Sequence, residues 1–288
     1  MSIFTTMKKI FWISRPISWP NTAYPFAVGY LLTGGSVDLT LVLGTLYFLG
    51  PYNLLMYGVN DVFDYESDIQ NPRKGGVEGM RESRAFHPKI IKAAILTNAP
   101  FLTYLLLIGD WAARLTLAIV VFSVIAYSLK GLRFKEKPII DSLTSSLHFV
   151  GPLLFALSLH GFPSEAWGFV MAFFIWGAAS HALGAIQDII PDKQAGIASV
   201  ATYIGARPTV WLAFVLYFIA AFSVFFQGSE YAIVTIVGLL YCLNIAPYLK
   251  VTEATSGKTN RAWKRFLWLN YISGFVITMV ILIPLFVL

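Results

Sequence analysis

The sequence predicts an all-α, polytopic membrane protein that forms a single domain over residues 1–288, and three observations lead to this prediction. First, hydrophobic residues make up 57% of the chain and charged residues only 12%, whereas a soluble domain usually has about 25% charged residues. Second, the apolar residues gather in runs close to the ~20 residues that a helix needs to cross a bilayer. Third, nearly all Lys and Arg residues fall into alternate connections between those runs.

Nine apolar runs predict nine transmembrane helices, an arrangement that places the two termini on opposite sides of the membrane. The first run follows Lys8 and Lys9 and has no small-residue cleavage site, so we expect a retained helix and not a signal peptide. The predicted helices cover residues 17–34, 40–62, 90–108, 111–128, 139–160, 165–187, 207–227, 230–249 and 266–288.

The positive charges predict the orientation of these helices. If the N-terminus is cytoplasmic, every Lys and Arg except Arg114 lies in a cytoplasmic segment, as the positive-inside rule requires. We therefore expect a cytoplasmic N-terminus, an outer C-terminus and a multi-pass protein of the cell membrane. The net charge of +6 follows from topology, and we expect no nucleic-acid partner.

A first group of acidic residues follows the second predicted helix. Asp61, Asp64 and Asp68 are three and four residues apart, a spacing that places them on one helical face bordered by Asn60. Carboxylates stacked this closely repel one another unless a cation or a proton intervenes. Ionisable groups near membrane depth are costly and usually functional.

A second pair of carboxylates, Asp188 and Asp192, is predicted at the cytoplasmic end of the sixth helix. A spacing of four residues again places both on one face if the helix continues. Pro191 removes a backbone hydrogen bond, so we expect the helix to kink or end there and Asp192 to lie on the following loop.

Basic residues accompany both acidic groups on the same predicted membrane face. Carboxylates together with Lys and Arg suit a magnesium diphosphate, because Mg²⁺ binds a few carboxylate oxygens and completes its shell with water and phosphate oxygens. A single Asp at a helix end is more often an interfacial anchor, and cytoplasmic Lys and Arg are mainly determinants of topology. Arg73, Lys130 and Lys193 are the predicted diphosphate contacts.

These motifs resemble those of the UbiA-type intramembrane prenyltransferases. The resemblance rests on Asn60-Asp-x-x-Asp64-x-x-x-Asp68 and Asp188-x-x-x-Asp192, and it covers essentially the whole chain. It implies a nine-helix bundle that transfers a prenyl group from an allylic diphosphate to a lipophilic acceptor in the membrane. Supporting matches are Arg15-Pro16, Tyr127-x-x-Lys130, Gly196 and Thr202.

The metal ligands and catalytic residues follow from this resemblance and from the acidic pattern together. One Mg²⁺ would be bound by Asp61, Asp64 and Asp68, with Asn60 completing or orienting its shell. The other would be bound by Asp188 and Asp192. Aromatic rings on the same helices could stabilise a passing carbocation. Tyr52, Tyr57, Tyr127 and the polar Asn21 are the predicted substrate-binding residues.

Within the family, three segments are most similar to lycopene elongases, which add five-carbon units to lycopene in C50 carotenoid synthesis. They are RPISWPNTAYPFAVGYLL, YGVNDVFDYESDIQNPRKGG and LGAIQDIIPDKQAGIASVAT. The resemblance implies dimethylallyl diphosphate as donor and lycopene as acceptor. An aromatic quinone precursor is the alternative acceptor, and a cation-coupled transporter is the alternative class of protein. His148 and His181 are interpreted as hydrogen-bonded packing residues.

Overall fold

The computed structural model describes residues 2–69, 75 and 80–287, and its side-chain description leaves out 67, 281, 282 and 284–287. Over these residues the chain consists of α-helices, short 3-10 helices and loops, with no β-strand. The predicted all-α class is confirmed. The chain divides into two compact units, Met1–Arg133 with Gly151–Gly161 and Phe134–Val150 with Phe162–Leu288. A single domain over 1–288 remains a prediction.

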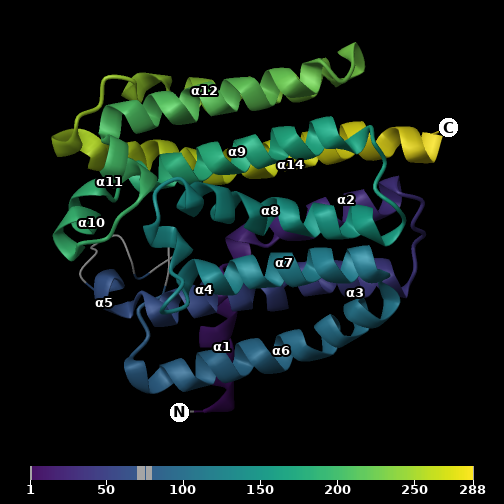
Figure 1. The fold of residues 1–288 in the computed structure, drawn as a ribbon, viewed down its shortest axis with the longest axis horizontal. Helices are drawn as coiled ribbons and strands as arrows, with labels where there is room; N and C mark the ends of the chain where they lie inside the picture. The colour runs from purple at the N-terminus through teal and green to yellow at the C-terminus, as the bar shows by residue number, and fades with distance from the viewer. Residues whose placement is uncertain (1, 70–74, 76–79, 288) are drawn as a thin grey trace. The chain divides into compact units, whose positions relative to one another are not determined.

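The first unit contains the N-terminal helices and the first acidic motif (Figure 1). Helix α1 runs across the other helices of this unit and is not among the helices predicted from the sequence. The elements are α1 (Ile3–Ile13), η1 (Pro16–Ser18), α2 (Pro20–Leu32), α3 (Leu39–Leu49), α4 (Pro51–Phe63), α5 (Tyr65–Asp68), η2 (Arg84–Phe86), α6 (His87–Ile108), α7 (Trp111–Ser128) and the second half of α8 (Ile140–Leu159).

An aromatic cluster forms the centre of the first unit. Phe26 of α2 packs against Phe48 of α3, with ring centroids 5.2 Å apart, and against Phe155 of α8 at 6.1 Å. Gly44 permits this packing, because a Cβ atom there would lie 2.1 Å from the ring of Phe26. Helices α2, α3 and α8 therefore approach closely where a glycine faces a ring.

The second unit contains the second acidic motif and the C-terminal helices. Helices α9 and α12 pack through small residues such as Ala179, Ala182 and Ala213, all fully buried, which allows the close approach typical of membrane helices. The elements are η3 (Phe134–Glu136), the first half of α8, α9 (Ala166–Ile186), α10 (Ile189–Ala195), α11 (Val200–Ile204), α12 (Ala206–Phe225), η4 (Ser229–Tyr231), α13 (Ala232–Ile245), η5 (Ala246–Tyr248), η6 (Glu253–Thr259) and α14 (Asn260–Val287).

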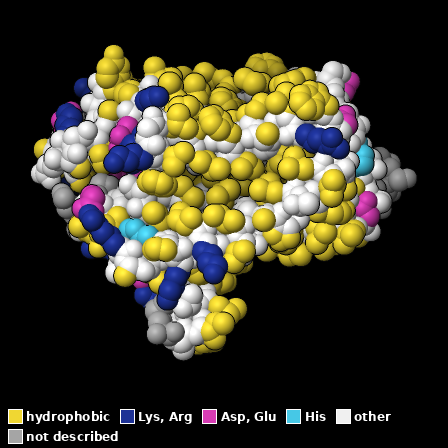
Figure 2. Space-filling model, turned by 60° about the horizontal axis from the view of Figure 1, so that its bottom comes forward, with side chains coloured by type: hydrophobic (Ala, Val, Ile, Leu, Met, Phe, Trp, Pro, Cys, Tyr) yellow, Lys and Arg dark blue, Asp and Glu magenta, His cyan; other side chains and the backbone are white. Residues whose placement is uncertain are grey.

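Seven helical segments among the described residues are long and apolar enough to cross a membrane. Helices α3 and α4 count together as one of them, Leu39–Phe63. The predicted helix 17–34 corresponds to α2 with only 13 residues, and the predicted helix 266–288 overlaps α14, which has 28 residues and begins earlier, at Asn260. The count of nine is therefore not confirmed. Apolar side chains cover most of the face drawn in Figure 2, as expected of a surface in contact with lipid.

Candidate active site

The first acidic motif lies at a break between two helices. Helix α4 ends at Phe63, Asp64 is its C-cap residue, and α5 begins at Tyr65. Backbone hydrogen bonds continue across the break, from the Asp64 N–H to the Asn60 carbonyl and from the Asp68 N–H to the Asp64 carbonyl, each at 2.9 Å. The chain therefore keeps its helical turn across the break, and the carboxylates of Asp61 and Asp64 contact different partners.

Asp61 is held by the segment that follows α1 and by the chain at Met80. Its Oδ1 accepts a hydrogen bond from Arg15 Nη2 at 2.7 Å, and its Oδ2 accepts one from the Met80 N–H at 3.3 Å. The guanidinium of Arg15 also lies over the ring of Tyr57, 4.3 Å from its centroid. Both oxygens of this buried carboxylate are engaged by protein donors.

Arg15 adopts a backbone conformation that is unusual for a residue other than glycine. Its φ is 51°, in the left-handed region, and Pro16 follows it. A left-handed residue other than glycine is strained, and such strain persists where the surrounding contacts enforce it. Burial opposes the charge of Arg15 and Asp61 favours it, so that its pKa is raised overall. Arg15 is thus a partly buried cation held by Asp61 and Tyr57.

Asp64 is held by a second set of partners. Asn60 Nδ2 donates to Asp64 Oδ2 at 2.6 Å and to Ser128 Oγ at 3.0 Å. Arg133 Nη2 lies 3.7 Å from Asp64 Oδ1, and Arg133 Nη1 donates to the Phe63 carbonyl at 3.4 Å. The φ of Arg133 is 40°, so the two arginines that pair with this motif are both in the left-handed region.

The second acidic motif lies at another helix break. Helix α9 ends at Ile186, and Asp188 is the N-cap residue of α10. The Asp192 N–H donates to the Asp188 carbonyl at 2.8 Å, so both residues belong to one helical turn. The prediction that Asp192 lies on a loop is wrong. Pro191 falls in the first turn of α10, where the backbone N–H groups have no partner within the helix, and it therefore does not end the helix.

Backbone geometry fixes the chain after the second motif. Gly196, with φ 70°, is the left-handed C-cap of α10, and its N–H donates to the carbonyls of Asp192 and Lys193. Ser199 and Thr202 then form a capping box that starts α11. Gly196 and Thr202, the two residues that match the family pattern, are thus explained by the backbone conformation: the first caps α10 and the second belongs to the cap of α11.

The remaining predicted residues are spread through the two units. Tyr52 is fully buried in the aromatic cluster, with its ring 5.1 Å from that of Phe48, which is the environment of a core residue. Lys193 pairs with Glu253 at 2.8 Å, and both side chains are about half exposed. Asn21 and Tyr127 are partly buried, Lys130 is exposed, and Arg73 lies outside the described residues.

The donor chemistry of these residues fits Mg²⁺. Among the described residues, no three His, Cys, Asp or Glu side chains converge into a closed metal cage. Mg²⁺ seldom uses such a cage: it is usually held by one or two carboxylates together with substrate phosphates. Asp64 and Asp68 are buried carboxylates, 5% and 7% exposed, and Asp64 accepts a hydrogen bond from the amide of Asn60. They supply hard oxygen donors of the kind that a magnesium diphosphate requires.

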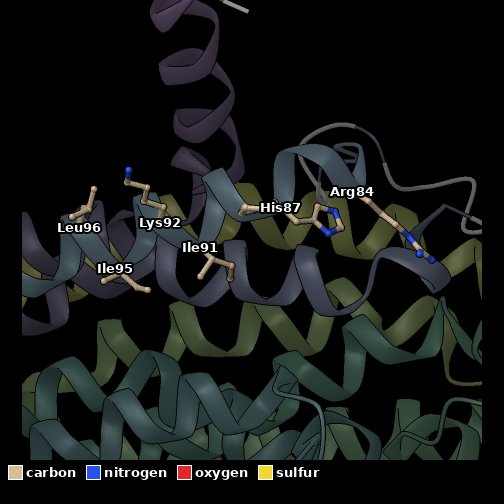
Figure 3. Close-up of a pocket in the computed structure, with 7 residues that line it drawn as sticks. Arg84, His87, Ile91, Lys92, Ile95 and Leu96 are labelled. Atoms are coloured by element: carbon tan, nitrogen blue, oxygen red, sulfur yellow. The ribbon is translucent and has the colours of Figure 1, made fainter.

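An open groove of about 590 Å³ lies along the start of α6. Figure 3 shows Arg84 of η2 and, on α6, the basic His87 and Lys92 with the aliphatic Ile91, Ile95 and Leu96. Basic residues at a helix end followed by exposed aliphatic residues are typical of a helix that enters a membrane from its interface. The groove contains none of the predicted site residues.

The fold and the two acidic motifs define an intramembrane prenyltransferase. A family model described as "UbiA prenyltransferase family" matches residues 22–270, and the chain belongs to this family. The chain is therefore a prenyltransferase, and the resemblance inferred from the motifs is confirmed.

Within this family, the chain is similar to proteins named for lycopene elongation and C50 carotenoid synthesis. The chain is 49% identical to the lycopene elongase/hydratase of Corynebacterium glutamicum over 93% of this chain and 94% of the relative. It is also 49% identical to the C(50) beta-cyclic carotenoids biosynthesis protein LbtBC of Dietzia sp., and the match covers 95% of this chain but only 64% of that protein.

Solved structures share the fold. A UbiA homolog from Archaeoglobus fulgidus bound to DMAPP and Mg²⁺ aligns with a TM-score of 0.67 and 19% identity, over 93% of this chain and 99% of that one. At this level of identity the likeness concerns the fold alone.

Proposed function

We propose that this enzyme transfers a five-carbon prenyl group from dimethylallyl diphosphate to lycopene, with Mg²⁺ as cofactor. The acceptor is suggested by the relatives, two of which are named for lycopene elongation or C50 carotenoid synthesis at 49% identity, and the donor by the resemblance of the motifs to those of lycopene elongases. The observation that carries the diphosphate site is the first motif. It combines buried carboxylates with two arginines at fixed positions in one unit.

Five residues are proposed to bind the magnesium diphosphate through oxygen donors. Asn60, Asp64 and Asp68 form one group, and Asp188 and Asp192 form the other. Asp61 was predicted as a further ligand. Because both of its oxygens accept hydrogen bonds from protein donors, we assign it to holding Arg15 instead.

The proposed reaction begins with loss of the leaving group. The C1–O bond of the donor breaks, its electron pair leaves with the diphosphate, and an allylic cation forms. Bound Mg²⁺ would neutralise charge on the departing diphosphate. Arg15 and Arg133 supply further positive charge at fixed positions, which favours the charge that develops in the transition state. The ring of Tyr57, already beneath the guanidinium of Arg15, can face a cation in the same way.

The acceptor then supplies electrons to the allylic cation. The π electrons of a terminal double bond of lycopene form the new C–C bond, and a tertiary cation remains on the acceptor. A reaction centre among apolar helices excludes bulk water, which would otherwise capture either cation. We propose that the site opens to the cytoplasm, where the soluble donor is found, with the N-terminus on the same side.

Two alternatives make different predictions. An aromatic quinone precursor as acceptor would leave the donor chemistry unchanged and alter only the product. A cation-coupled transporter would release no diphosphate, and the family membership of the chain argues against it. The acceptor is therefore the part of the proposal that most needs a direct test.

The test uses membranes that contain the full chain, incubated with dimethylallyl diphosphate, lycopene and Mg²⁺. We expect pigments heavier by one or two C5 units, one diphosphate released per unit, and no reaction after chelation. The Asp64→Asn variant is the matched control, since it removes one carboxylate charge and retains the shape of the side chain. Unchanged lycopene in the presence of active donor would refute this acceptor, and a metal-independent reaction would refute the cofactor.

A further inference from the structure

Helix α1 presents an apolar face to the outside of the first unit. Ile3, Phe4 and Met7 are 80%, 75% and 65% exposed, and Phe11 is 44% exposed. At about 100° per residue, these four side chains fall within roughly 100° of the helix circumference. Large apolar side chains exposed in one contiguous patch mark a surface that contacts a partner or a membrane.

The opposite face of α1 is polar. Thr5 and Lys9 lie on it, and Lys8 lies at its boundary with the apolar face. A helix with Lys on its polar side and Phe or Trp on its apolar side lies in the plane of the membrane interface, with the apolar side at the boundary of the acyl chains. Helix α1 has 11 residues, about half of what a spanning helix needs.

The direction of α1 agrees with a position in the interface. Helices α6 and α7 are long and apolar enough to cross a membrane, and α1 runs across them (Figure 1). Figure 3 shows the same crossing from another side, with α1 as the purple helix that leaves α6 steeply. A helix that crosses the direction of the spanning helices lies roughly parallel to the membrane plane.

Contacts with the segment before α6 set the depth of α1. Lys9 forms an ion pair with Glu82, and its ammonium lies 5.1 Å from the centroid of the Phe86 ring. Phe86 directly precedes α6 and belongs to the candidate span Arg84–Ile108. Helix α1 is therefore held at the end of a span, where the headgroup region of a bilayer begins.

The groove at the start of α6 has the chemistry of a phospholipid site (Figure 3). Lys92 is exposed, and Ile95 and Leu96, three and four residues later on the same face, are 60% and 61% exposed. A rise of about 1.5 Å per residue places them about 5 Å deeper along the span than Lys92. A cation above aliphatic side chains matches a negatively charged headgroup above its acyl chains.

The charges around α1 and the groove leave a positive excess. The two acidic side chains of this region are neutralised, since Glu66 pairs with Arg84 and Glu82 pairs with Lys9. The cations that form no ion pair within the described part of the chain are Lys8, Lys89 and Lys92. Their charge favours an anionic lipid over a zwitterionic one.

We propose that α1 and the start of α6 form a binding surface for anionic phospholipid. The apolar face of α1 lies among the outermost parts of the acyl chains, Lys8 and Lys92 bind lipid phosphate, and an acyl chain lies along Ile95 and Leu96. Phosphatidylglycerol fits this surface better than phosphatidylcholine, whose choline group would meet the lysines. The inference does not depend on the proposed function, because none of these residues belongs to the two acidic motifs.

Spin labels on the full chain in lipid nanodiscs test the position of α1. In a Cys242→Ser background, which removes the single cysteine, the label is attached through Phe4→Cys or Met7→Cys, with Thr5→Cys as the matched control. We expect the first two labels to collide with dissolved oxygen, which concentrates in lipid, and the control label to collide with a water-soluble nickel chelate. Equal access of nickel to all three labels would overturn the proposal, because α1 would then lie in water.

A fluorophore attached through Leu96→Cys, in the same background, tests which lipid occupies the groove. Its quenching by brominated phosphatidylglycerol is compared with its quenching by brominated phosphatidylcholine in nanodiscs. We expect a preference for phosphatidylglycerol at this position and none at Leu107→Cys, since Leu107 is near the other end of α6 and is 72% exposed. Equal lipid preference at both positions would overturn the proposal.

Charge variants separate this surface from the general attraction of a basic protein to anionic lipid. A Lys near an anionic surface strengthens the attraction by about fivefold, so Lys92→Gln should lower the preference measured at Leu96→Cys by about fivefold. Lys258→Gln, at an exposed lysine of η6 in the second unit, is the matched control and should leave the preference unchanged. An equal fall in both variants would overturn the proposal, since net charge alone would then explain the preference.

Discussion

The two acidic motifs of this prenyltransferase are held in place by different means. In the first, side-chain ion pairs hold the carboxylates: Arg15 contacts Asp61 and Arg133 approaches Asp64, both from left-handed backbone positions. Around the second motif, the path of the backbone is set by a helix break before Asp188, by Gly196 in the left-handed conformation and by the capping box of Ser199 and Thr202. The first motif therefore depends on particular charges, and the second on a particular chain path.

Burial explains the difference. Asp61 and Asp64 are each 5% exposed, and a buried carboxylate is costly unless it is paired and hydrogen-bonded. Asp188 and Asp192 are only partly buried, and the basic residue beside them, Lys193, is engaged in an exposed pair with Glu253. Changes of charge should thus have large effects at the first motif, and changes of backbone freedom should matter at the second.

The largest effect is expected from Asp64→Asn. This change removes a proposed magnesium ligand and leaves the hydrogen bond from Asn60 without a charged acceptor. We expect diphosphate release to fall by roughly a hundredfold or more, with normal insertion into the membrane. Measurement of turnover over a range of Mg²⁺ concentrations would check this. Near-normal turnover would remove Asp64 from the metal site.

The next effect concerns the ion pair between Arg15, which is partly buried, and Asp61, which is buried. Asp61→Asn removes the counter-charge of the guanidinium, and loss of one partner of a buried ion pair typically costs about 3–5 kcal/mol. We expect the double variant Arg15→Met/Asp61→Asn to cost less than the sum of the two single variants, because the two residues are coupled. Denaturation in detergent measures the stabilities. Additive costs would contradict the coupling.

The same variants distinguish a ligand from a positioning residue. If Asp61 holds Arg15, Asp61→Asn should raise the KM for the donor and leave the Mg²⁺ requirement unchanged. Asp64→Asn should change the Mg²⁺ requirement. A changed Mg²⁺ requirement in Asp61→Asn would return Asp61 to the metal ligands.

A smaller effect is expected from Gly196→Ala in the second motif. A Cβ atom on a residue with φ 70° lowers the free energy of unfolding by about 1–2 kcal/mol. The destabilised segment is the turn that follows Asp192. Gly257→Ala is the control, because that glycine has no positive φ and no atom within 4 Å of an added Cβ. Thermal unfolding should show a loss for Gly196→Ala alone. Equal losses would argue against the importance of the backbone path.

The smallest effect on stability is expected from Lys193→Ala. Exposed ion pairs such as Lys193–Glu253 contribute about 0–1 kcal/mol, so unfolding should hardly change. If Lys193 also contacts the diphosphate, as the sequence predicts, the KM for the donor rises in Lys193→Ala and not in Glu253→Ala. Equal KM values in both variants would restrict Lys193 to its surface pair.

The amino-acid sequence alone was sufficient to predict the all-α membrane class and the family. Low charge and long apolar runs leave a chain with few alternatives to membrane-spanning helices, because backbone polar groups in lipid must pair within a helix. The acidic residues at helix ends carry the resemblance to the prenyltransferase family, and the family membership is confirmed, whereas their role as metal ligands stays a prediction. Apolar runs and the spacing of acidic residues are local features, so they can be recognised from the sequence pattern alone.

The contact partners of the site residues come from distant parts of the chain and depend on the tertiary structure. Arg15 and Asp61 are 46 positions apart, and Arg133 is 70 positions from the Phe63 carbonyl that it contacts. His181 meets Ser142 across 39 positions, on a second helix. No local pattern encodes such pairs, because they depend on how helices pack. The same spacing of carboxylates therefore leads to a metal ligand at Asp64 in our proposal and to an ion-pair anchor at Asp61.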